Sequence, residues 1–303
     1  MRKKLFSIMA LAIAMFAMFS CSDDNAESEM NEGNTASLAV TVGFANEEDA
    51  KTKANKITIA VYDEEGNEVK RVIRDNAFDN GEPLLFARVP EGKKYDVAAW
   101  LQYSGCEAYN TIDLRNVTVN YEGAVSNDHK RDVFMASLQG VQVDGYTEQR
   151  IELARPTTLI NLGDANCFVD VAQSEVTISN LATSINVLSG EMGGSQVVTF
   201  DKSEAFAEYL NVDTDGDKVN EAFYWISSNY VLVNNDKVHT QYTLVTEDGT
   251  ESVVSKEITP APNQRVNIIM EEGEVTKVIT DDINNRSDQT FPLSKWATFT
   301  LTI

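Results

Sequence analysis

Short stretches in which apolar and polar residues alternate strictly are the feature that most constrains this chain. Residues 37–44, SLAVTVGF, place Leu38, Val40, Val42 and Phe44 on one face, and a period of two is typical of a half-buried β-strand. The last eight residues, WATFTLTI, alternate in the same way. Further β-rich runs, separated by turn residues, cover residues 56–73, 84–102, 111–121, 149–163, 175–181, 196–200, 230–235, 237–249, 251–260 and 265–279.

Many short strands with frequent turns predict an all-β sandwich or barrel. We expect a hairpin over residues 56–73 and a second hairpin over residues 84–102, which bends at Pro90–Gly92. Only residues 127–139 and 202–210 carry apolar side chains at helical spacing. The predicted fold is therefore two tandem β-sandwich domains with a few short helices.

The length of 303 residues exceeds that of a typical single domain. Arg155–Pro156 is the expected seam, because the proline follows a strand-like run and favours extended geometry in the residue before it. We therefore expect domains at residues 37–154 and 155–303. Cys106 and Cys167 fall in different domains; pairing in an oxidising compartment and buried free thiols are both open.

The start of the chain has the pattern of a secretory signal peptide. Arg2, Lys3 and Lys4 precede an apolar run that reaches Ser20, and this run is shorter than a membrane-spanning helix. The small residue before Cys21 resembles the lipobox of bacterial lipoproteins. That resemblance implies a lipid on the thiol of Cys21 and attachment to the outer membrane. The alternative is a secreted protein whose signal is cut elsewhere.

The residues after Cys21 are acidic. Ser22, Asp23 and Asp24 resemble the surface-export signal of Bacteroidota lipoproteins, which implies a position on the cell surface. The alternative is a solvated spacer, because residues 21–36 carry too few apolar side chains to offset the entropy of ordering them. The two interpretations are compatible, and we expect a flexible tether over residues 21–36.

Net charge limits the choice of partner. The chain carries 47 Asp and Glu residues against 25 Lys and Arg residues, which gives a net charge of −22. A surface of that sign repels nucleic acid and anionic lipid. We therefore expect no nucleic-acid partner.

No pattern in the sequence indicates catalysis. The two histidines, His129 and His239, lie far apart in the sequence, and no zinc, nucleophile-elbow, dinucleotide or P-loop motif occurs. We therefore predict a protein that is not an enzyme and needs no cofactor. Trp100, Trp225 and Trp296 lie in apolar strand runs, which favours packing in the core over stacking on sugars.

One acidic loop resembles a cation-binding sequence. Residues 211–222, NVDTDGDKVNEA, place oxygen-bearing side chains at positions 1, 3 and 5 of an EF-hand-like loop. Position 12, which needs a glutamate, is Ala222. We therefore predict no metal, favour a connecting loop, and keep Asp213, Asp215 and Asp217 as weak candidate ligands.

Several longer stretches resemble a fimbrillin-like lipoprotein family of Bacteroidota. They are residues 89–123, 126–136, 151–166, 224–233 and 262–270. The resemblance spans roughly residues 37–280. It implies two transthyretin-like β-sandwich domains, proteolysis beyond the first strand, and polymerisation by strand donation into fimbriae. Other members of the family are tips, anchors or unpolymerised surface proteins.

The chain departs from this family in one place. The loop between the first two strands contains no arginine, so only Lys51 and Lys53 are candidate processing sites in it. We interpret the protein as a structural or adhesive surface lipoprotein whose partners are other fimbrial subunits. The alternative is a monomeric, lipid-anchored module that binds a glycan or host ligand. Residues 296–303 either donate a strand or close their own domain.

Overall fold

The computed structural model describes residues 34–45, 52–166, 171–206 and 208–282, which form mainly β-strands. The helical structure among these residues is one 3-10 turn at His129–Arg131. None of the described segments includes a helix with the length and apolar character needed to span a bilayer. The predicted all-β sandwich fold is confirmed.

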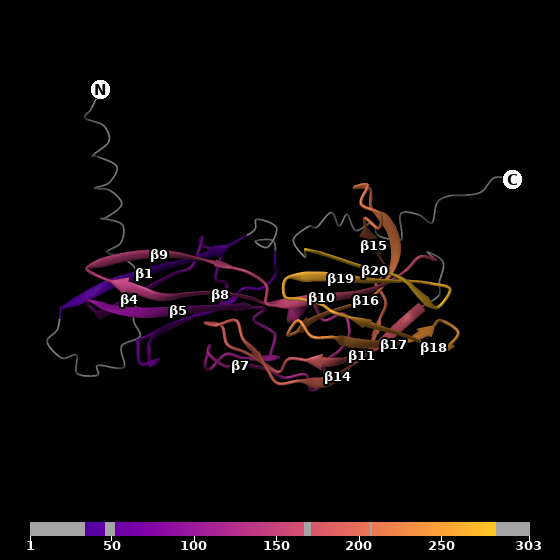
Figure 1. Cartoon of the computed structure of the whole chain (residues 1–303), viewed down its shortest axis with the longest axis horizontal. Coiled ribbons are helices and arrows are strands. Elements are labelled where there is room, and N and C mark those ends of the chain that lie inside the picture. Colours follow the sequence, from indigo (N-terminus) through magenta and orange to yellow (C-terminus); the bar gives the residue numbers. More distant parts are fainter. Residues whose placement is uncertain (1–33, 46–51, 167–170, 207, 283–303) are drawn as a thin grey trace, which may run out of the picture. The chain divides into compact units, whose positions relative to one another are not determined.

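Two sheets built from the first half of the chain pack face to face. The first sheet has the order β4 (Leu84–Pro90), β1 (Thr35–Phe44) and β9 (Tyr146–Leu153). The second has the order β3 (Glu68–Arg74), β2 (Lys56–Tyr62), β5 (Lys93–Gln102) and β8 (Phe134–Val143). Alternate apolar residues of both sheets share one hydrophobic core, so these sheets form a sandwich (Figure 1).

The second half of the chain supplies another pair of sheets. One has the order β15 (Tyr209–Val212), β16 (Glu221–Leu232), β10 (Thr157–Asp164), β19 (Gln264–Glu271) and β20 (Glu274–Asp282). The other has the order β14 (Gln196–Glu204), β11 (Val171–Leu181), β17 (Val238–Thr246) and β18 (Glu251–Ile258). Buried residues of both sheets, including Ile160 and Val176, belong to one core.

A small fifth sheet joins strands from both halves. Its order is β13 (Met192–Gly193), β12 (Ser184–Ile185), β7 (Val117–Val119) and β6 (Tyr109–Asn110). The N–H of Val187 donates to the carbonyl of Leu114 at 2.9 Å across this junction. The division of the chain into domains at residues 154 and 155 stays a prediction.

Arg155 is anchored at the predicted seam. Its Nε lies 2.7 Å from Asp132 Oδ1, and its Nη2 donates to Asp132 Oδ2 at 3.1 Å. The guanidinium also lies over the ring of Phe134, 4.4 Å from the ring centroid. Arg155 is buried, and this bidentate pair fixes the start of the β10 segment.

Both predicted helices are wrong. In the stretch 127–139, residues 129–131 form the 3-10 turn, and residues 134–139 belong to β8, which pairs with β5. In the stretch 202–210, β14 ends at Glu204 and β15 begins at Tyr209. Short apolar runs fit helix and strand spacing alike, and pairing with a neighbouring strand decides between them here.

The hairpin predicted over residues 84–102 is also wrong, although the hairpin of β2 and β3 is confirmed. A turn does follow Pro90, but β4 pairs with β1 while β5 pairs with β2 and β8. The two strands therefore lie in opposite layers of the sandwich. A turn signal gives the position of a reversal and leaves open which sheet the next strand joins.

Candidate functional site

The first strand is inserted between two others, and this arrangement is the main candidate site. β1 pairs antiparallel with β4 from Thr35↔Pro90 to Thr41↔Leu84. On its other side it pairs parallel with β9 from Ser37↔Tyr146 to Phe44↔Leu153. Figure 1 shows the three strands lying together. If β1 left, β4 and β9 would each present an edge of unpaired backbone groups.

The inward face of β1 is deeply buried, as the alternation predicts. Leu38, Val40 and Val42 are each 0% exposed and pack in the core with residues such as Leu85 and Ile151. Burial of three such side chains is worth together roughly 5–9 kcal/mol before entropy is counted. The surface that β1 covers between β4 and β9 is therefore strongly hydrophobic.

The C-terminal end of β1 is held from inside by an aromatic side chain. The ring of Phe44 lies 4.9 Å from that of Phe78 and 5.4 Å from that of Phe134, measured between centroids. The N–H of Ala45 then donates to the carbonyl of Leu153 at 3.2 Å. This end of the strand leads directly into the predicted processing loop.

One of the two predicted processing residues is described by the structure. Lys53 is exposed, whereas the next residue, Ala54, is buried. Asn55 donates its N–H to Gln102 and accepts the N–H of Ala77. A protease therefore needs this turn to open locally before it can cut after Lys53. Lys51 lies outside the described residues.

The acidic loop brings its three predicted carboxylates together. Ligand oxygens of Asp213, Asp215 and Asp217 lie within 4.8 Å of one another. Asp213 accepts the N–H of Gly216 at 2.7 Å, and bonds of this kind hold the pKa of Asp213 below its usual value. Glu221 Oε2 accepts the N–H of Thr214 at 2.8 Å and braces the loop. These carboxylates therefore serve the loop's own backbone, which fits the connecting role that we favour.

Trp100 and Trp225 pack against other side chains, whereas His129 and His239 are both exposed. Trp100 is 0% exposed, and its Nε1 donates to Gln102 Oε1 at 3.0 Å. Trp225 stacks on Phe206 with ring centroids 4.2 Å apart. His129 packs against both of these rings, whereas His239 lies on β17. The structure therefore does not bring the two histidines into one described cluster.

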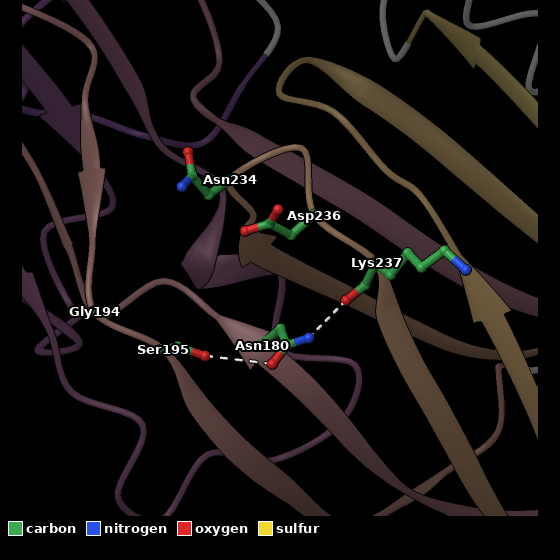
Figure 2. A pocket seen from close by; sticks show the side chains of 6 residues that line it. All are labelled: Asn180, Gly194, Ser195, Asn234, Asp236 and Lys237. Carbon is green, nitrogen blue, oxygen red and sulfur yellow. Dashed lines mark hydrogen bonds between the residues drawn. The ribbon is translucent and has the colours of Figure 1, made fainter.

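An open polar pocket of about 390 Å³ was not expected from the sequence. Figure 2 shows Asn180 linked to Ser195 and to the backbone of Lys237, while the side chains of Asn234 and Asp236 line another part of the pocket. The ammonium of Lys237 pairs instead with Glu257 at 2.6 Å. The lining contains no aromatic ring. A cluster of Asn, Asp and Lys around a turn is too common in sequences to identify such a pocket.

Several predicted site residues lie outside the described part of the chain. They are Cys21, Ser22, Asp23, Asp24, Cys167, Trp296 and residues 296–303. Cys106 is described: its thiol is free and buried, and burial raises its pKa. The lipid site, the export signal and the donor strand remain predictions.

Known proteins resemble this chain in two ways. Residues 20–288 match a family of unknown function, DUF6562. A proposed adhesin from Bacteroides thetaiotaomicron superposes with a TM-score of 0.52 at 15% identity, covering 88% of this chain and 100% of its own. A crystal structure of proposed polysaccharide-binding proteins from the same organism superposes with a TM-score of 0.51 at 12% identity, covering 81% of this chain and 96% of its own.

A weaker match is the C-terminally truncated tip fimbrial protein Mfa3 of Porphyromonas gingivalis, with a TM-score of 0.46 at 11% identity, covering 82% of this chain and 98% of its own. No curated protein matches the sequence. The first two structures share their fold with this chain at low identity. The match over residues 20–288 shows that the chain belongs to the DUF6562 family.

Proposed function

We propose that this protein is a lipid-anchored structural or adhesive protein of the cell surface, and that it acts as a fimbrial subunit or accessory component. The observation that carries the proposal is the seat of β1 between β4 and β9. A strand from another subunit could replace β1 there, pairing with both free edges and filling the apolar groove.

The position of β1 in the chain supports this role. Its last residue is followed within a few positions by the candidate processing residues Lys51 and Lys53. A cut there would leave β1 joined to the body by noncovalent contacts alone. The shared fold with a proposed adhesin is consistent with a surface role.

The anchor is proposed from the residues around Cys21. Lipid on the Cys21 thiol would attach the chain to the outer membrane, with Ser22, Asp23 and Asp24 as the export signal. Replacement of Cys21 by Ala should then abolish metabolic labelling with palmitate and release the protein from the membrane fraction. Unchanged labelling would contradict the anchor while leaving the strand-exchange proposal standing.

Controlled proteolysis tests the assembly role. Purified protein is cut by limited trypsin in the loop after β1, and its oligomeric state is followed by size-exclusion chromatography with light scattering. We expect higher oligomers from the cut protein and a monomer from the uncut protein. The same experiment on a chain without residues 296–303 identifies the donor, because oligomers that form equally well without this segment exclude it.

A binding module is the second candidate, because the pocket in Figure 2 presents an amide and a carboxylate at the surface. The amide can donate hydrogen bonds to sugar hydroxyls and accept hydrogen bonds from them, and the carboxylate can accept them. The test is a glycan array probed with wild type and with Asp236→Ala. Binding that disappears in the variant, together with a monomer that never assembles after cleavage, would favour this candidate.

A further inference from the structure

A salt bridge passes over the outer face of β1. Glu82 lies just before β4 and Arg150 lies on β9, the two partners of β1. Arg150 Nη2 is 2.7 Å from Glu82 Oε1, and Arg150 Nε donates to Glu82 Oε2 at 3.3 Å. The bidentate pair therefore joins the two walls of the groove across the strand that fills it.

Gly43 lies directly beneath this pair. A Cβ atom placed on Gly43 would overlap both the guanidinium of Arg150 and the carboxylate of Glu82. Gly43 alternates with Val42 and Phe44, whose side chains point toward the core, so its missing side chain would point outward. The glycine thus leaves the room through which the two charged side chains meet.

The ion pair acts at the end of β1 that proteolysis would free. Gly43 is the next-to-last residue of the strand, and the candidate processing loop follows Phe44. A cut in the loop would free this end of β1, so peeling of the strand can begin here. Phe44 holds the end from inside, and the ion pair covers it from outside.

We propose that Glu82 and Arg150 form a clasp that retains the end of β1 and sets the rate at which the cut strand leaves the groove. This inference rests on the proposed strand exchange. Both side chains are more than two-fifths exposed, so the clasp is screened by salt and opens readily. It therefore slows release of the strand without making release impossible.

The neighbouring Glu152 supplies a matched control. Its Oε1 lies 2.5 Å from Arg150 Nη1, but both residues belong to β9. The pair of Arg150 and Glu152 does not span β1, so its loss should not change how tightly β1 is held. Glu82→Gln and Glu152→Gln each remove one carboxylate charge beside the same guanidinium. The contact of Glu82 spans β1, whereas the contact of Glu152 stays within β9.

The first test uses hydrogen exchange on the uncut protein. We expect Glu82→Gln to raise the exchange rate of the amides at residues 42–45 by about threefold, as for the loss of an exposed ion pair, and Glu152→Gln to leave it unchanged. Gly43→Ala should raise the rate in wild type and add little in the Glu82→Gln background, because both changes open the same contact. Equal rates in wild type and Glu82→Gln overturn the clasp.

The second test follows the strand itself in trypsin-cut protein by native mass spectrometry. We expect Glu82→Gln to release the N-terminal fragment about threefold faster than wild type or Glu152→Gln. Added salt should speed release in wild type and in Glu152→Gln, which both keep the clasp, and should have little effect on Glu82→Gln. Equal release rates in all variants overturn the clasp and leave strand exchange intact. If no variant releases its fragment while hydrogen exchange still responds to Glu82→Gln, the clasp retains the strand end, but its role in setting the release rate and the proposed exchange both fail.

Discussion

β1 and β10 occupy the same topological place in their respective sheets. Each has one antiparallel and one parallel neighbour: β1 lies between β4 and β9, and β10 lies between β16 and β19. Yet all eight residues of β10 are buried, whereas the outward side chains of β1 include the half-buried Ser37 and Thr41. The same topology thus gives one strand that is buried on both faces and one whose outer face is only partly buried.

The ends of the two strands differ as well. The segment leading into β10 is anchored by the buried pair of Arg155 and Asp132. β1 begins at the exposed Thr35 and ends beneath the exposed pair of Glu82 and Arg150. Two strands with the same topology thus differ in the burial of their outer faces and of their ends. We propose that this difference makes β1, and not β10, replaceable.

The largest expected effect is on the anchor of β10. Asp132→Ala removes the carboxylate from a buried guanidinium, which should lower the free energy of unfolding by about 3–5 kcal/mol. Chemical denaturation measures this change. As a control, Asp113→Ala breaks the exposed pair with Arg115 and should cost less than about 1 kcal/mol. Equal losses in the two variants would contradict the difference in anchoring.

Matched cavities in the two strands sharpen the comparison further. Leu38 on β1 and Leu162 on β10 are both 0% exposed, so replacement of either by Ala should cost about 2–5 kcal/mol in the uncut protein. After the loop is cut, only Leu38→Ala should speed release of the N-terminal fragment in native mass spectrometry. A Leu162→Ala variant that released this fragment equally fast would show that general loosening, rather than the seat of β1, controls release.

The smallest expected effect is a pH dependence at the end of β10. Burial raises the pKa of Asp164 above its ordinary 3.8. The folded chain thus holds this proton more tightly than the unfolded chain, and ionisation costs stability as the pH rises through the folded pKa. Asp164→Asn keeps an oxygen for the N–H of Asn166, which lies 2.6 Å away in wild type, and should raise the melting temperature at pH 7.

The gain from Asp164→Asn should shrink as the pH falls and should vanish below about pH 3, where the carboxyl is protonated in both states. Thermal unfolding across this pH range measures the trend. A gain that stayed constant with pH would mean that the substitution acts through packing and not through the charge.

The sequence predicts strands well where one face is buried and the other meets solvent. The inward face of β1 follows from its alternation. Arg155–Pro156, where we expect the domain seam, lies between the end of β9 and the start of β10. Residues 134–143 could not be assigned in this way, because their apolar spacing fits two periods and pairing with β5 decides.

The details of the candidate site depend on contacts between distant parts of the chain. The parallel pairing of β1 with β9 joins residues that lie more than a hundred positions apart. Glu82 and Arg150 are 68 positions apart. No pattern in the sequence near Gly43 predicts that two charged side chains meet above it. Local patterns predict elements, whereas such contacts follow from the way the elements assemble.

Replacement of β1 by an added strand tests the central claim most directly. Protein cut in the loop after β1 is mixed with an excess of an isotope-labelled peptide of residues 35–45 and analysed by native mass spectrometry. Strand exchange at β1 predicts that the labelled peptide replaces the original N-terminal fragment while the rest of the chain stays folded, and that uncut protein takes up none. A cut protein that stays folded, keeps its original fragment and never takes up the peptide would contradict it.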